Sequence, residues 1–388
     1  MQPFDFCRPT KVVFGAGRIA ELGKIAAGYG SKVLFVTYDK AMMESIGLLD
    51  KALAPLKQAG LDVAECYGVK SNPSLDHARE LVKLAKQAKP DVMVALGGGS
   101  VIDECKCIGA SLGSDADIWD MVEGKKPVTA SIPLIAVCTI PATSSEMNNI
   151  AVISNDAINR KEGLMSDLIC PAVALLDPAI TTTIPMRQTA YSSADIVSHL
   201  LEGYLSHTEP FVPMQNRYFD SMIKVQMECM ERLLENPADI DARAMMMWAA
   251  TFSWNGFCVL GIGPMESLIH VLGHSLSAFY DTPHGASMAI MIPAVMKYTL
   301  NKRVARYARI ARNVFGLDED DDLRAAKLGI EMMTAWLDRI GAPTSFAKGG
   351  IPTNELDKLT DNAYQSCCNF GMTNYTKEDI KKMYELSL

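Results

Sequence analysis

The first half of the chain alternates short apolar runs with amphipathic stretches, and this alternation limits the folds open to it. The apolar runs predict buried strands, whereas the stretch Leu75–Ala88 is apolar at roughly every third or fourth position, which is typical of a helix. Strands separated by such helices form a parallel, doubly wound sheet. The expected strands are Lys32–Thr37, Leu61–Tyr67, Asp91–Leu96, Pro133–Ile140 and Ala172–Asp177, with a short hairpin strand at Ala151–Ser154.

The character of the sequence changes between Thr183 and Arg187. Beyond this point Met-, Leu- and Ala-rich stretches continue almost to the end with few β-branched runs, which predicts helices. A length of 388 residues suits two domains at about 100–200 residues each. We therefore expect an α/β domain with a doubly wound parallel sheet over residues 1–185 and an all-helical domain over residues 186–388.

Charge and composition exclude several classes of function. The formal net charge of −8 and the sequence pI near 5.4 provide no basic surface for nucleic acid. No run of about eighteen apolar residues is present, so we expect no membrane span. The N-terminus shows no secretory signal, and the ten cysteines are scattered without a CxxC pair, which favours reduced thiols and a cytoplasmic protein.

Two glycine-rich segments are candidates for binding a phosphate. The segment Phe14–Ala20 matches a dinucleotide fingerprint only weakly, because its preceding strand is short and no clear βαβ unit begins there; a tight turn is the preferred interpretation. The segment Leu96–Ser100 directly follows an apolar strand and precedes a helix. Its three glycines let a ligand approach the backbone, and the helix N-terminus offers free N–H donors. We expect the pyrophosphate at this second loop.

Histidines gather in the second half of the chain. His270, His274 and His284 account for half of the six histidines and lie within 15 residues, while Asp195 and His199 are four residues apart. Residues four apart on a helix share one face and lie about 5–6 Å apart at Cβ. Imidazole and carboxylate are ligands of Fe(II) and Zn(II). The sequence therefore predicts a metal site, in which either His270 or His274 would be placed to bind.

These segments resemble the iron-containing (group III) alcohol dehydrogenase family over nearly the whole chain. The resemblance rests on the histidine segment Gly261–Pro293, on the segments Ala95–Lys106 and Thr139–Glu146, and on Ala174–Pro178. Within the family, the segments Pro141–Asn148 and Ala151–Asn155 are most similar to the butanol dehydrogenase and aldehyde reductase branch. The resemblance implies an NAD(P)-linked enzyme that interconverts a primary alcohol and its aldehyde by hydride transfer, and it suggests a homodimer or a higher homo-oligomer.

The family pattern also implies roles for particular residues. One divalent ion, Fe(II) in the first place and Zn(II) next, would be held by Asp195, His199, His270 and His284. His274 would lie beside it, and we expect it to relay a proton or to be a structural histidine. The dinucleotide would contact Asn72, Gly97, Gly98, Gly99, Ser100, Asp103, Thr139, Thr143, Ser144 and Lys161, although Lys161 also fits a solvated surface position.

Asp39 bears on the choice between NAD and NADP. A carboxylate just past the strand Lys32–Thr37 would accept both ribose hydroxyls and repel a 2′-phosphate. The resemblance implies that members of the aldehyde reductase branch tend to have the sequence Gly-Gly-Ser in this loop and to use NADP. This chain instead has Tyr38-Asp39-Lys40. NAD is therefore favoured as the cofactor, with NADP as the alternative.

Other activities share this architecture. A dehydroquinate-synthase-like lyase would need many basic residues for its substrate, and no cluster of them surrounds the expected ligands; a polyol dehydrogenase lies between the lyase and the alcohol dehydrogenase. A metal- or nucleotide-binding protein without turnover is opposed by the intact glycine loop and ligand set. Outside these motifs, we expect His77 to be solvated and His207 to lie in a loop, and Trp254 to be either a wall of the substrate pocket or core.

Overall fold

The computed structural model describes residues 1–206 and 211–388; His207 lies outside them. Contacts divide the chain into two units. The α/β unit comprises Cys7–Ile184 and Ala238–Thr251, and the helical unit comprises Met1–Phe6, Pro185–Pro237 and Phe252–Leu388. The segment Ala238–Thr251 stays with the α/β unit because Met247 joins its core and Thr251 bonds to the buried carboxylate of Glu146. The expected division into a dinucleotide-binding domain over residues 1–185 and a metal- and substrate-binding domain over residues 186–388 stays a prediction.

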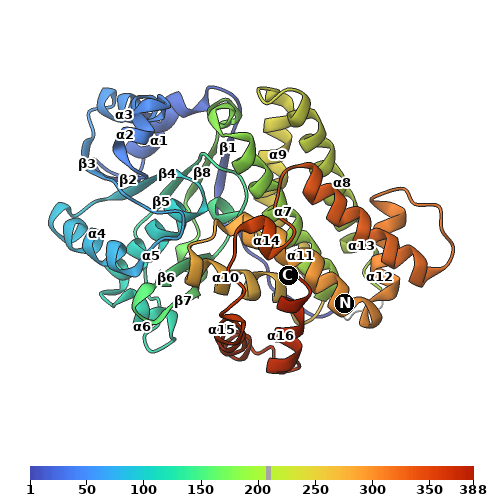
Figure 1. Cartoon of the computed structure of the whole chain (residues 1–388). Helices are drawn as coiled ribbons and strands as arrows, with labels where there is room; N and C mark the ends of the chain where they lie inside the picture. The colour runs from blue at the N-terminus through green and yellow to red at the C-terminus, as the bar shows by residue number, and fades with distance from the viewer. Residues whose placement is uncertain (207–210) are drawn as a thin grey trace. The chain divides into compact units, whose positions relative to one another are not determined.

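The α/β unit is built on a parallel sheet whose strands follow the order β1-β8-β5-β4-β2-β3 (Figure 1). Adjacent strands are in parallel register, for example Leu34 with Met93 and Met93 with Leu134. The doubly wound fold predicted from the sequence is confirmed. The strands are β1 (Lys11–Phe14), β2 (Lys32–Thr37), β3 (Asp62–Cys66), β4 (Val92–Gly97), β5 (Leu134–Cys138) and β8 (Val173–Leu176).

Successive side chains of a strand point to opposite sides of the sheet, and helices cover both sides, so the central strands are buried on both faces. Phe35, Val94 and Val137 pack on the face covered by α1 and α3, whereas Leu34 and Met93 pack on the face covered by α4 and α5 (Figure 1). The helices of this unit are α1 (Leu22–Ala27), α2 (Lys40–Ser45), α3 (Leu48–Gln58), α4 (Leu75–Ala88), α5 (Gly99–Ser114) and α6 (Ile118–Val122).

A two-stranded antiparallel hairpin, β6 (Ile150–Asn155) and β7 (Arg160–Met165), lies beside α5. The expected strand at Ala151–Ser154 is part of β6. Short 3₁₀ turns complete the unit and recur in the helical one: η1 (Arg18–Glu21), η2 (Ser145–Met147), η3 (Asp156–Ile158), η4 (Asp167–Ile169), η5 (Pro178–Thr183), η6 (Phe257–Val259) and η7 (Leu300–Lys302).

The helical unit has α7 and α11 at its core, because almost every residue of their inner turns is buried. Among the described residues no helix combines the length and apolar character that a membrane crossing requires. The helices of the second half are α7 (Met186–Ser206), α8 (Pro213–Glu235), α9 (Ile240–Ser253), α10 (Leu268–Tyr280), α11 (His284–Thr299), α12 (Val304–Asn313), α13 (Asp322–Arg339), α14 (Phe346–Gly349), α15 (Leu356–Asn369) and α16 (Lys377–Glu385).

Candidate metal centre and nucleotide site

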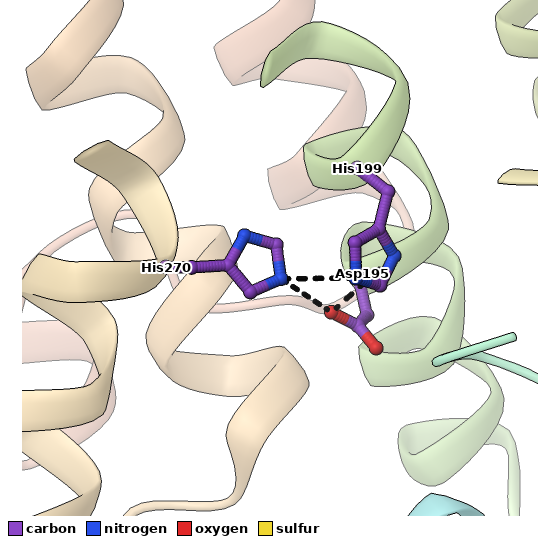
Figure 2. Close-up of side chains that lie close together, drawn as sticks. All are labelled: Asp195, His199 and His270. Atoms are coloured by element: carbon purple, nitrogen blue, oxygen red, sulfur yellow. Dashed lines mark hydrogen bonds and ion pairs between the residues drawn. The ribbon is translucent and has the colours of Figure 1, made fainter. Parts of the chain in front are cut away.

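Three helices of the helical unit bring the predicted metal ligands together. Asp195 and His199 lie one turn apart on the buried face of α7, His270 lies in the first turn of α10, and His284 is the first residue of α11. One oxygen or nitrogen atom from each of Asp195, His199 and His270 lies within 4.8 Å of the other two. Figure 2 shows His270 reaching from α10 toward the two side chains on α7.

The ligand atoms converge on one point. The Nε2 atoms of His199 and His270 are 3.0 Å apart, and Asp195 Oδ1 lies 3.7 Å from His270 Nε2 (Figure 2). His284 is outside this triplet, yet its Nε2 lies 3.3 Å from the same carboxylate oxygen. Asp195 Oδ1 is therefore surrounded by imidazole nitrogens from three sequence segments.

This arrangement fits a divalent cation. Asp195 Oδ1 is buried and accepts no hydrogen bond within the described residues, although a buried carboxylate oxygen normally has a partner. Two imidazole nitrogens facing each other at 3.0 Å need a proton or a cation between them, since two lone pairs repel. Nitrogen and carboxylate donors without thiolate suit Fe(II), Zn(II) and related ions.

The electrostatics of the cluster favour a bound positive charge. Burial alone would raise the pKa of Asp195, but the imidazoles of His284 and His199 hold it well below its usual range. Burial lowers the pKa of His199 to about 3. Burial also opposes charge on His270, yet the carboxylates of Glu202 and Asp195 raise its pKa to about 10. The two carboxylates thus gather positive charge on His270, and a bound metal ion would supply that charge in its place.

The surroundings of the ligands are aromatic and compact. The indole of Trp254 stacks on the His199 imidazole, with centroids 5.2 Å apart and planes inclined by 27°. His274 lies beside the cluster, its ring 6.0 Å from that of His270 and 5.4 Å from that of His284. His274 is therefore close to two predicted ligands without joining the triplet.

Gly285 explains how His284 comes near Asp195. A Cβ atom at this position would overlap the backbone carbonyl of Tyr191, which precedes Asp195 by one turn of α7. The start of α11 therefore packs directly on the backbone of α7, and only glycine allows this approach. Pro283 precedes the helix as its N-cap residue.

In the α/β unit, Asp39 and the glycine loop Gly97–Ser100 lie at the carboxyl ends of β2 and β4. The chain leaves β2 toward α3 on one face of the sheet and leaves β4 into α5 on the other. Ligands of open α/β sheets bind in the crevice at such a topological switch point. Tyr38 and the loop Gly97–Ser100 therefore occupy the place where a dinucleotide is expected.

The glycine loop Gly97–Ser100 packs so closely on neighbouring residues of the protein that side chains would not fit at its three glycines. A Cβ atom on Gly97 would overlap Val101, one on Gly98 would crowd Ile140, and one on Gly99 would overlap Thr143. The Tyr38 hydroxyl accepts a 3.0 Å hydrogen bond from the Gly98 N–H and lies 3.1 Å from Ser100 Oγ. The next two N–H groups, those of Gly99 and Ser100, bond to nothing among the described residues and remain as donors at the start of α5.

Of the other residues predicted to bind the cofactor, Asn72, Lys161 and Asp39 lie outside the loop that follows β5. Lys161 is buried and its ammonium donates a 2.8 Å hydrogen bond to Asn72 Oδ1, which excludes the solvated alternative. Asp39 is exposed at the end of β2, where one carboxylate oxygen accepts from the Met42 N–H and begins α2.

The other four residues, Asp103, Thr139, Thr143 and Ser144, make hydrogen bonds that hold the loop after β5. The carboxylate of Asp103 is buried and accepts from Ser145 Oγ and from the Val152 N–H at 3.0 Å. Ser144 has a left-handed φ of 54° and donates its hydroxyl to the Ala250 carbonyl. The backbone of Thr139 bonds to the Gly97 carbonyl, and the Thr143 hydroxyl accepts from the Ser145 N–H. The protein itself therefore uses much of the polar capacity of this loop.

The alternative phosphate loop is occupied by the protein. The N–H groups of Gly17 and Ile19 each donate a 3.0 Å hydrogen bond to the carboxylate of Asp177. The segment Phe14–Ala20 is thus a turn bound to an internal anion, as the sequence indicated.

Comparison with known proteins identifies the family. The sequence profile of the iron-containing alcohol dehydrogenase matches residues 9–178, and that of the C-terminal region of the same family matches residues 189–388. The chain belongs to the iron-containing alcohol dehydrogenase family. The family, the fold class and the enzyme class predicted from the sequence, an NAD(P)-dependent alcohol dehydrogenase or aldehyde reductase, are confirmed.

Individual relatives span the whole chain. NADH-dependent butanol dehydrogenase A of Clostridium acetobutylicum is 34% identical over 368 residues, which cover 94% of each chain. NADPH-dependent aldehyde reductase YqhD of Escherichia coli is 32% identical over 363 residues, 92% of each chain. The crystal structure of NADH-dependent butanol dehydrogenase A from Thermotoga maritima matches with a TM-score of 0.95 and 35% identity, covering 100% of this chain and 99% of the other.

Sequence reasoning missed two residues that touch the sites. Tyr38 entered it only as a departure from the family pattern, although this residue directly follows a strand end. Glu202 contacts His270 through both carboxylate oxygens. Its spacing from Asp195 and His199, at positions i, i+4 and i+7 of one helix, was a signal that could have found it.

Proposed function

We propose that this chain interconverts a primary alcohol and its aldehyde by direct hydride transfer to or from NAD(H), with one divalent ion held by Asp195, His199, His270 and His284. The observation that carries the proposal is the convergence of Asp195 Oδ1 and the Nε2 atoms of His199 and His270 on one buried point. Fe(II) is the first candidate ion and Zn(II) the second. When bound, such an ion acts as a Lewis acid on the substrate oxygen.

The residues of the α/β unit would bind and orient the dinucleotide. The N–H groups of Gly99 and Ser100 would donate to the pyrophosphate at the start of α5, where the helix dipole favours negative charge. Asp39 would accept the ribose hydroxyls and disfavour NADP. The proposal includes contacts of the cofactor with Asn72 and Lys161 and with two further groups. These are Gly97, Gly98 and Asp103 at the end of β4 and in the first turns of α5, and Thr139, Thr143 and Ser144 in the loop after β5.

The residues of the helical unit would handle the substrate and its proton. His274 lies beside two of the proposed ligands and is the candidate to carry the hydroxyl proton toward solvent. The indole of Trp254 on His199 adds an apolar wall, which suits an unbranched or aryl aldehyde better than a polyol. The names of the butanol dehydrogenase relatives support a short primary alcohol.

The proposal extends to assembly and location. We propose a homodimer or larger homo-oligomer, which light scattering on the purified chain would measure. All cysteines described by the structure are free thiols, which supports a reducing compartment such as the cytoplasm.

The test uses protein stripped by a chelator and reloaded with Fe(II) or Zn(II) without oxygen. The rate of NADH oxidation with butyraldehyde should return with the metal, and NADPH should be used less well. The isosteric Asp195→Asn variant should bind less metal per chain and lose roughly 100-fold or more of the rate, because a buried metal site loses its only carboxylate ligand. Metal-independent turnover, or none with any metal over a panel of alcohols and aldehydes, would refute the proposal.

A further inference from the structure

Glu202 is a buried acid that touches a proposed metal ligand but has no place in the proposed ligand set. It lies on α7, three residues after His199, and its carboxylate is 2% exposed. Its Oε2 lies 2.8 Å from His270 Nδ1, and its Oε1 accepts a 2.9 Å hydrogen bond from the backbone N–H of His270. Both oxygens of one carboxylate are thus used on one histidine from another helix.

The backbone contact anchors the start of α10. His270 is the third residue of this helix, whose first N–H groups have no intrahelical partner. The N-cap residue Ser267 makes no side-chain capping bond. Glu202 therefore caps α10 from a neighbouring helix, and its negative charge lies at the positive end of the helix dipole.

The side-chain contact fixes how the imidazole is presented. A carboxylate at Nδ1 requires the proton to be on that nitrogen, because the carboxylate can only accept. The lone pair of a neutral imidazole is then on Nε2, which is the atom 3.0 Å from His199 Nε2 and 3.7 Å from Asp195 Oδ1. Carboxylate partners of this kind orient metal-binding histidines and raise their basicity.

We propose that Glu202 is the positioning residue of the metal centre: it locks the ring and the tautomer of His270 and joins the two helices that carry the ligands. The inference rests on the proposed metal-dependent function. It also completes the charge of the site, since Asp195 and Glu202 together balance one divalent ion.

The experiment compares Zn(II) affinity by chelator competition in the wild type, in Glu202→Gln and in the control Glu266→Gln. The amide introduced by Glu202→Gln can accept only one of the two hydrogen bonds, so the dissociation constant for Zn(II) should rise about 10- to 100-fold. Glu266 belongs to the same unit, but its carboxylate accepts hydrogen bonds from Tyr375 Oη at 2.8 Å and from Arg303, neither of which is a proposed metal ligand. Its variant should lower the thermal midpoint and leave the Zn(II) affinity within about twofold of the wild type.

A second readout does not depend on the folding of the Glu202 variant. In the Zn(II)-loaded wild type with ¹⁵N-labelled histidine, the His270 signal, identified by its absence in His270→Gln, should show a protonated Nδ1 and a metal-bound Nε2. Coordination through Nδ1, or unchanged Zn(II) affinity in Glu202→Gln, would overturn the role of Glu202. A wild type that binds neither Zn(II) nor Fe(II) would instead refute the proposed function on which this role rests.

Discussion

At the scale of the residue, part of the candidate metal centre follows from local spacing rules that can be read in the sequence. Asp195 and His199 share a helix face because they are four apart, and this pair was predicted from spacing alone. Spacing left His270 and His274 equivalent as ligands. The structure brings only His270 into the triplet, since its Nδ1 is held by Glu202 from a position 68 residues away. The spacing of Glu202 on α7 places it on the ligand face, but the spacing does not indicate which histidine of another segment it contacts.

A substitution at Asp39 can test the cofactor preference by removing the charge of the side chain while keeping its role as a helix cap. Asparagine caps helices as well as aspartate does, so Asp39→Asn should keep the start of α2 while removing the charge proposed to repel a 2′-phosphate. We expect the ratio of kcat/KM for NADPH to that for NADH to rise roughly tenfold, about 1.4 kcal/mol. Glu44→Gln, which removes an exposed carboxylate from the same helix, should leave the ratio unchanged. An unaltered ratio in Asp39→Asn would assign the preference to other residues.

Tyr38 gives a test of the glycine loop. Its hydroxyl is the partner of the Gly98 N–H, so Tyr38→Phe should loosen the loop that presents the Gly99 and Ser100 donors. The loss of one hydrogen bond, about 0.5–1.5 kcal/mol, predicts NADH binding that is about 2- to 12-fold weaker. Fluorescence titration with NADH measures this, and Tyr67→Phe, whose hydroxyl bonds to Glu65, is the matched control. Tighter binding in Tyr38→Phe would mean that the hydroxyl competes with the cofactor.

At the scale of the element, the alternation of apolar runs predicted the parallel sheet, but it did not predict a strand of mostly polar residues. The expected strand Lys32–Thr37 matches β2 residue for residue, because all but its first residue are buried. The strand β7, with the sequence RKEGLM, lacks an apolar pattern and was not predicted. The expectation for His77 was wrong: on α4 its Nδ1 bonds to the buried carboxylate of Glu104 on α5, and its Nε2 lies 3.2 Å from the Tyr67 carbonyl.

The link between α4 and α5 predicts a pH dependence of stability. The hydrogen bond to Glu104 raises the pKa of His77, whereas burial raises the pKa of Glu104 against the effect of His77. Because the folded pKa of His77 lies above the unfolded value near 6.5, its stabilisation is complete below about pH 6.5 and is lost as the pH rises through the folded pKa. Urea midpoints of the wild type should therefore fall from pH 6 to pH 9 more than those of His77→Gln. Parallel curves would contradict this role.

At the scale of the whole molecule, the contacts between segments follow a chain path that the sequence did not indicate. The α/β unit carries the residues proposed for the dinucleotide and the helical unit those proposed for the metal. The return of Ala238–Thr251 to the α/β unit was not foreseen, because Met247 and Thr251 pack as ordinary residues of one helix and only the tertiary contacts reveal their partners.

The most direct measurement of the central claim is anomalous diffraction at the iron edge from crystals grown with Fe(II) in the absence of oxygen. We predict one peak per chain, within bonding distance of Asp195 Oδ1 and of Nε2 atoms from His199, His270 and His284. A peak elsewhere, or no peak in a protein that still reduces butyraldehyde with NADH, would contradict a metal-dependent mechanism at this cluster.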